Sequence, residues 1–208
     1  GMYSISSVIN DVEIVKVPLD FESFQIKPAE INETVNKDPS IKMVYVTSPG
    51  NPTAAKVDFE LIEKILLNDK WNGLVIADEA YIDFAPVGSS LSTLVNKYPN
   101  LVVLQTLSKS FGLAGIRLGI TYSSERLSSI LNALKAPYNI SSLTADIAFR
   151  ALSKESINKM RRTVEVLNAE RARLLSQLEK LSGIKKNIGG LDGNFLLVQV
   201  KNSSGEPD

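Results

Sequence analysis

Residues 101–119 read LVVLQTLSKSFGLAGIRLG, and this stretch decides the fold that we expect. It opens with an apolar run, LVVL, which has the length and composition of a buried strand. Lys109 follows that strand, with the hydroxyls of Thr106 and Ser108 before it and Arg117 after it. The guanidinium and the hydroxyls can hold a phosphate while the lysine amine attacks an aldehyde to form a Schiff base. The alternative interpretation is a strand that ends in a solvated Ser-Lys turn.

The composition narrows the chemistry open to the chain. Its 208 residues are 44% hydrophobic and 22% charged, with zero formal net charge, so we expect a globular protein with no nucleic-acid partner. No apolar run has the length of a membrane span, and we expect no membrane contact. Cysteine and histidine are absent, which excludes disulfides, thiolate or imidazole metal sites and a Ser-His-Asp triad within these residues. Acid–base work falls to lysine, tyrosine or carboxylates.

Apolar runs of strand length alternate with segments of helical spacing. We expect strands at 12–17, 41–47, 74–77, 101–104, 116–121 and 194–200. We expect helices after Pro28 and at about 58–68, 91–97, 125–135, 142–152 and 153–181. This alternation predicts an α/β fold with a mostly parallel sheet flanked by helices on both faces.

The long charged segment 153–181 predicts a helix that connects two domains. We therefore expect a large domain over 1–152, and over 153–208 the interdomain helix with the first strand of a small α+β domain. The alternative is a plain surface helix of a single domain. Because the chain starts at Gly1 and stops soon after a strand, we expect a piece of a longer protein, with the large domain incomplete at its N-terminus and the small domain truncated.

Polar side chains follow three of the predicted strands directly. In open α/β sheets, ligands bind at the carboxyl ends of the strands. We expect the amine, the acid and the guanidinium of this set to converge on one hollow. Each candidate also has an alternative interpretation. Asn51 could be a turn residue, and Asp78 could cap a turn. Tyr81 could be an ordinary half-buried aromatic residue, and Arg117 could form an ion pair with a carboxylate. The candidates are Asn51, Asp78, Tyr81, Ser108, Lys109 and Arg117.

A pyridine aldehyde that carries a phosphate would use each of these groups. A carboxylate such as Asp78 keeps a pyridine nitrogen protonated, so that the ring can accept electrons from a substrate carbanion. A lysine such as Lys109 binds the aldehyde and, once released, moves a proton to or from the substrate.

Four segments, SPGNPT, ADEAYIDF, TLSKSFGLAGIRLG and KAPYNIS, resemble in this order the aspartate-aminotransferase-like, fold type I pyridoxal-phosphate enzymes. The resemblance covers essentially the whole chain. It implies pyridoxal 5'-phosphate as cofactor and no metal. By position it implies Lys109 as the Schiff-base lysine, Asp78 at the pyridine nitrogen, Tyr81 and Asn51 at the ring hydroxyl, Ser108 and Arg117 at the phosphate, and Tyr138 at the substrate.

Within this family, DEAYIDF and APYNIS look most like the members that act on L-histidinol phosphate. The resemblance implies transamination between that amino donor and 2-oxoglutarate in histidine biosynthesis, by a cytoplasmic protein that is a homodimer when full length. Two alternatives stay open. One is another aminotransferase or a decarboxylase of this fold that acts on aromatic or phosphorylated amino acids, and the other is a non-catalytic binding or assembly fragment.

The chain departs from the family pattern in two respects. The family usually reads Asn-Pro-Thr-Gly, whereas Ala54 takes the place of the glycine here, so we expect a slightly altered turn. The family also has an N-terminal segment with phosphate-binding amides and a ring-stacking aromatic, and a C-terminal arginine for the substrate carboxylate. Both of these parts are expected to lie outside this chain.

Overall fold

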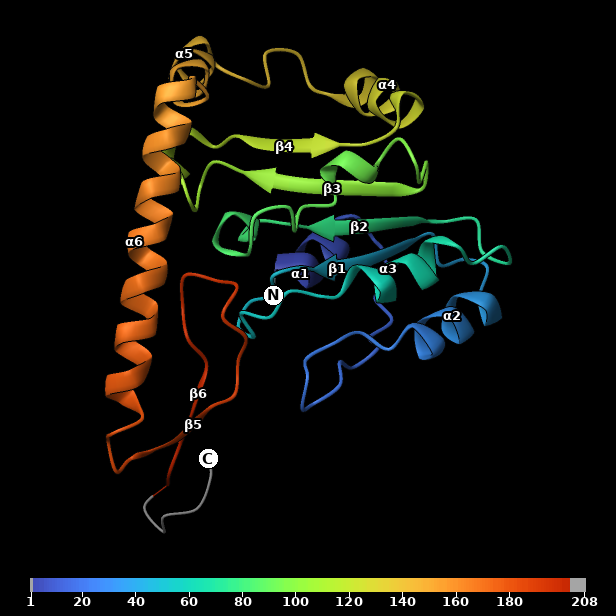
Figure 1. The fold of residues 1–208 in the computed structure, drawn as a ribbon. Helices are drawn as coiled ribbons and strands as arrows, with labels where there is room; N and C mark the ends of the chain where they lie inside the picture. The colour runs from blue at the N-terminus through green and yellow to red at the C-terminus, as the bar shows by residue number, and fades with distance from the viewer. Residues whose placement is uncertain (1, 203–208) are drawn as a thin grey trace.

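The computed structural model describes residues 2–202, and a four-stranded mixed sheet lies at its centre (Figure 1). Strands β1 (Met43–Thr47), β2 (Leu74–Asp78) and β3 (Leu101–Thr106) are parallel and adjacent in that order. Strand β4 (Gly119–Tyr122) pairs antiparallel with β3. The predicted α/β class with a mostly parallel sheet is therefore confirmed.

One face of the sheet carries the main hydrophobic core. Alternate strand residues, among them Val75 and Val103, are fully buried against helices α2 (Pro28–Lys37) and α3 (Phe59–Leu66). Helix α3 contributes Ile62 and Ile65, one turn apart on the same side, and both are also fully buried. Each such side chain contributes about 1.5–3 kcal/mol to folding. This burial favours the observed register, because a slip of one residue would move these side chains to the opposite face of the sheet, away from α2 and α3.

On the opposite face the edge strand β1 is more open than the middle of the sheet, where Ile76 and Val102 are buried. Met43 and Tyr45 of β1 point to this face and are about half exposed (45% and 47%). Helix α1 (Met2–Ile9), which the sequence did not predict, lies on this side, where the Tyr3 ring contacts the Tyr45 ring at 4.8 Å between centroids. The carboxyl end of β2 therefore has solvent access from this side.

The C-terminal third is organised by the long helix α6 (Lys154–Leu178), which runs beside the sheet from α5 (Ser142–Ala151) toward a small hairpin (Figure 1). The side chain of Ser153 caps α6 by accepting the N–H of Ser156. Helix α4 (Glu125–Leu134) precedes α5, and β5 (Ile184–Asn187) pairs antiparallel with β6 (Val198–Val200). The predicted long helix is present, whereas the division into two domains stays a prediction. None of the helices in residues 2–202 has the length and apolarity to cross a bilayer.

Two predicted elements are wrong. Residues 12–17 form no strand, because their alternating pattern finds no neighbouring strand and Val12 and Val15 are about half exposed. The predicted helix at 91–97 is only the single 3₁₀ turn η2 (Ser92–Leu94). The N–H of Leu91 is taken by the carboxylate of Glu79, and the chain turns into β3 a few residues later.

Two predicted strands are shorter or shifted. Residues 114–116 form the 3₁₀ turn η3 (Ala114–Ile116), so the strand predicted at 116–121 starts only at Gly119. The strand predicted at 194–200 shrinks to β6, because the segment before it pairs with the loop after β1. In that pairing the N–H of Gly190 donates to the carbonyl of Thr53 at 2.8 Å, and the N–H of Asp192 to that of Ala54 at 2.8 Å.

Ala54, where the family has glycine, adopts a left-handed backbone conformation with φ of 53° and is fully buried. We predict that Ala54→Gly leaves the free energy of unfolding nearly unchanged. Glycine relieves about 1–2 kcal/mol of backbone strain in the folded state. This gain offsets two losses, about 0.5–1 kcal/mol because the unfolded chain gains conformational entropy and about 0.8 kcal/mol because a buried methyl group is removed. Urea denaturation measures the difference. The control is Ala55→Gly, at a buried neighbour without positive φ, which should lose about 1–2 kcal/mol; equal losses at both positions would contradict the strain.

Candidate active site

Three strand ends meet at one edge of the sheet. Thr47, the last residue of β1, is in register with Asp78, the last residue of β2, and Asp78 is in register with Leu104 of β3. The loops that continue these strands carry Asn51 and Lys109. The topology therefore places the predicted candidates from three strands at the same edge.

Tyr81 is the centre of the contacts among these candidates. The amide of Asn51 donates a hydrogen bond to the Tyr81 hydroxyl at 3.3 Å. The ammonium of Lys109 lies 5.2 Å from the centroid of the Tyr81 ring, which is within cation–π range. The ring of Phe195, from the segment before β6, forms a T-shaped pair with the same ring at 5.1 Å between centroids. The structure thus brings Asn51, Tyr81 and Lys109 together.

Asp78 is half-buried and both of its carboxylate oxygens accept hydrogen bonds. Oδ1 accepts the N–H of Ala80 at 3.0 Å, and Oδ2 accepts the hydroxyl of Tyr3 from helix α1. Burial and the hydrogen bond to Asp78 raise the pKa of Tyr3 well above its usual value, so this phenol stays a donor. Sequence reasoning missed Tyr3. The available signal was the resemblance itself, which already covered the first residues of the chain.

The groups predicted to hold a phosphate are arranged less closely. Ser108 is tied to Thr106, whose hydroxyl donates to the Ser108 hydroxyl at 2.9 Å and accepts the Ser108 N–H at 3.1 Å. Arg117 has a left-handed backbone (φ 54°), and its guanidinium donates to the carbonyl of Ala114 at 3.1 Å rather than to a carboxylate. Tyr138, between α4 and α5, is 98% exposed, and the structure does not bring it to the other candidates.

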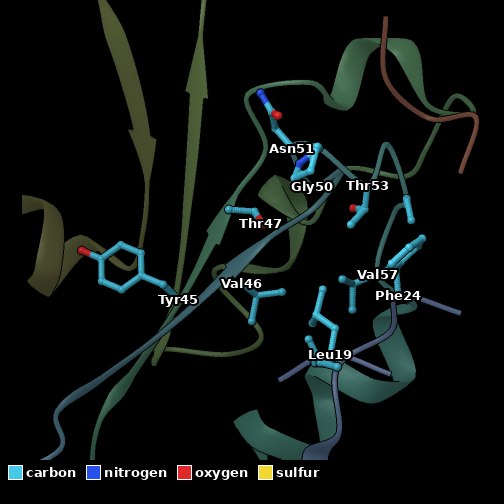
Figure 2. Close-up of a pocket in the computed structure, with 12 residues that line it drawn as sticks. Leu19, Phe24, Tyr45, Val46, Thr47, Gly50, Asn51, Thr53 and Val57 are labelled. Carbon is cyan, nitrogen blue, oxygen red and sulfur yellow. The ribbon is translucent and has the colours of Figure 1, made fainter. Parts of the chain in front are cut away.

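A cavity of about 250 Å³ lies beside this edge, but on the core side of β1. Leu19, Tyr45, Val46 and Val57 line it together with the loop of Asn51 (Figure 2). Lys109, Asp78 and Arg117 do not line it. This cavity is therefore not the expected hollow shared by these three side chains, and their convergence on one hollow stays a prediction.

Glu79, next to Asp78, is almost fully buried and braces the loops behind the site. Its carboxylate accepts from the Ser90 hydroxyl at 2.6 Å, the Leu91 N–H at 2.7 Å and the Gln105 amide at 2.9 Å. Burial raises the pKa of Glu79 although these donors oppose the shift. The carboxyl is thus held in the core by the loop of Ser90 and Leu91 and by strand β3 rather than offered to a ligand.

The raised pKa of Glu79 makes folding stability depend on pH. A pKa that is higher in the folded state contributes stability below the unfolded value, and this contribution is lost as pH rises through the folded value. We predict that the wild-type chain loses more unfolding free energy than Glu79→Gln when the pH rises from about 4.5 to 7.5. Urea denaturation of both proteins at several pH values tests this. Parallel pH profiles would contradict it.

The fold is that of an α/β protein in which the predicted site residues lie at the carboxyl ends of parallel strands, where such sheets bind ligands. The sequence model of aminotransferase class I and II matches residues 1–206, and the chain belongs to this family. Enzymes of this class use pyridoxal 5'-phosphate. The curated relatives include the histidinol-phosphate aminotransferase of Candida maltosa, 54% identical over 209 residues, which cover 100% of this chain and 54% of that protein. The enzyme of the same name from Saccharomyces cerevisiae is 52% identical over 96% of this chain and 52% of that protein.

Solved structures share the fold. The histidinol-phosphate aminotransferase of Clostridium acetobutylicum superposes with a TM-score of 0.85 at 24% identity, over 96% of this chain and 59% of that one. The enzyme of the same name from Sinorhizobium meliloti, in complex with pyridoxal-5'-phosphate, gives a TM-score of 0.78 at 20% identity, over 91% of this chain and 50% of that one. The chain thus spans about half the length of the curated relatives that it matches.

Proposed function

We propose that this chain carries the cofactor site of an aminotransferase that moves an amino group between L-histidinol phosphate and 2-oxoglutarate in histidine biosynthesis. The observation that carries the proposal is the position of Lys109, whose ammonium lies over the Tyr81 ring at the edge where Asp78 ends the neighbouring strand. The names of the curated relatives at 52–54% identity support histidinol phosphate as the amino donor.

The donor set fits pyridoxal phosphate group by group. Asp78 offers a carboxylate for the protonated ring nitrogen and Lys109 an amine for the aldehyde. Ser108 offers a hydroxyl for the phosphate. Arg117 has five N–H donors, of which the carbonyl of Ala114 takes one, so its guanidinium keeps donors for a phosphate.

The tasks of the individual residues follow from their contacts. When bound, pyridoxal phosphate supplies an aldehyde that binds amines and a ring that accepts electrons from the substrate carbon. Lys109 Nζ would hold that aldehyde until the amino donor replaces it, and Nζ would then carry a proton to or from the substrate α-carbon. Because Asn51 donates to the Tyr81 oxygen, the Tyr81 hydroxyl hydrogen is directed elsewhere and can be donated to a ring oxygen.

Covalent labelling tests the proposal directly. The chain is mixed with pyridoxal phosphate, reduced with borohydride and digested, and the modified peptides are mapped by mass spectrometry. We expect the stable adduct on Lys109. Label spread over the exposed lysines, or no label, would reject the proposed site and favour a non-catalytic role for this chain.

We further propose that the intact protein is a homodimer. Large apolar side chains of the α4–α5 segment, among them Leu134, Leu143 and Phe149, are more than three-quarters exposed, which supports a partner surface there. Sedimentation velocity of the intact protein distinguishes a dimer from a monomer. The cytoplasmic location stays a prediction.

A further inference from the structure

Tyr3 reaches across 75 residues of sequence to the carboxylate of Asp78. Its hydroxyl donates to Oδ2, while the N–H of Ala80 holds Oδ1 at 3.0 Å. A carboxylate with a donor on each oxygen has a fixed plane and still has lone pairs for a further donor. Tyr3 and Ala80 can therefore hold Asp78 without occupying all of its accepting capacity.

The ring of Tyr3 is itself held by the sheet. It packs against the ring of Tyr45 at 4.8 Å between centroids, with 47° between the ring planes. Tyr45 of β1 is in register with Ile76 of β2, and Asp78 lies two residues after Ile76 on the same strand. Because side chains two residues apart on a strand point to the same face, Tyr45 and Asp78 lie on the same face of adjacent strands. The Tyr3 side chain thus spans from a rigid strand residue to the carboxylate.

Other contacts of helix α1 do not explain this arrangement. The helix has no buried residue, and its large apolar side chains Met2, Ile5 and Val8 are 53–79% exposed. Tyr3 is the side chain through which the helix touches the sheet at Asp78 and Tyr45. The Tyr3 hydroxyl therefore contacts Asp78, the residue that we predict to bind the cofactor.

We propose that Tyr3 is a positioning residue, which holds Asp78 in the orientation that accepts a protonated heteroaromatic nitrogen. This inference rests on the proposed function, because it gives the carboxylate a ring nitrogen to face. Tyr3 touches neither the substrate nor the reacting atoms in this assignment. It acts through Asp78.

The test combines two variants with two ligands. Tyr3→Phe removes only the hydroxyl that reaches Asp78. Tyr45→Phe is the matched control, because it removes a hydroxyl from the adjacent ring without a bond to Asp78. Dissociation constants are measured by absorbance for pyridoxal phosphate and for its 1-deaza analogue, in which a carbon replaces the ring nitrogen. Thermal unfolding of each variant reports whether it is folded.

We expect Tyr3→Phe to weaken pyridoxal phosphate about tenfold, which is the size of one hydrogen bond to a charged group, and the deaza analogue by less than about twofold. Tyr45→Phe should change neither ligand by more than about twofold. Equal weakening of both ligands by Tyr3→Phe, or no weakening, would overturn the positioning role. If Tyr3→Phe does not fold, Tyr45→Leu takes its place, because it removes the ring that supports Tyr3. Tyr45→Leu must then weaken pyridoxal phosphate more than the deaza analogue, and equal effects on both ligands would reject the positioning role. If the unaltered chain forms no adduct on Lys109, the proposed function itself fails and the positioning role fails with it.

Discussion

Lys109→Ala will abolish amino-group transfer in the intact protein, with kcat/KM lowered by at least about 10³-fold. In the proposed function, the amine that binds the aldehyde and the base that moves the proton are the same atom, Nζ of Lys109, so one substitution would remove both tasks. Nearby groups do not replace it: the Tyr81 phenol is held by Asn51, and Asp78 is held by Tyr3 and Ala80. Steady-state transfer from L-histidinol phosphate to 2-oxoglutarate measures the loss.

The chain provides a matched control for this substitution. Lys97 also places its ammonium over a tyrosine ring, 4.7 Å from the centroid of Tyr98, but lies away from the strand ends that form the candidate site. Lys97→Ala should keep the transfer rate within about twofold of the unaltered protein, as expected for a surface substitution. If Lys109→Ala keeps a tenth or more of the activity, the lysine does not carry the chemistry.

The parts of the site that depend on local sequence could be predicted. An apolar run followed at once by polar residues marks the carboxyl end of a buried strand, and this pattern located Asn51, Asp78 and Lys109 at one sheet edge before the register was known. The burial of these strands followed from the same continuous apolar runs, and Val75 and Val103 within them are fully buried.

The parts that depend on distant contacts could not be predicted from pattern. Tyr3 reaches Asp78 across 75 residues, and no periodicity near either residue signals that contact. Residues 12–17 alternate like a strand but have no neighbour to pair with, so the pattern failed there. Arg117 has the expected type for phosphate binding, and its guanidinium donates to the carbonyl of Ala114 three residues before it, a local contact that the sequence pattern also did not signal. The direction of the Tyr3 side chain, in contrast, depended on tertiary structure.

Asp78→Ala will lower kcat for amino-group transfer in the intact protein by about 10²–10³-fold, as for the loss of one preorganised charged group in an active site. In the proposed role, the Asp78 carboxylate at the end of β2 faces a ring nitrogen, and its charge would keep that nitrogen protonated. Asp78→Asn should lose nearly as much, because the amide keeps the size and one acceptor oxygen but carries no charge. Steady-state kinetics of both variants, with borohydride labelling of Lys109, separates lost chemistry from lost cofactor.

The control for Asp78 is Asp83, a second carboxylate in the 3₁₀ turn η1 (Ile82–Phe84) that follows β2, which accepts a hydrogen bond from the Ser110 hydroxyl instead. Asp83→Asn should lower kcat far less than Asp78→Asn, although both substitutions remove one negative charge from the same part of the molecule. Asp78→Ala also leaves the Tyr3 hydroxyl without its acceptor, which costs about 1 kcal/mol of stability, so thermal unfolding must accompany the kinetics. Equal losses of kcat at positions 78 and 83 would mean that general electrostatics matter more than contact with the ring nitrogen. Full turnover in Asp78→Ala would remove the role assigned to this carboxylate.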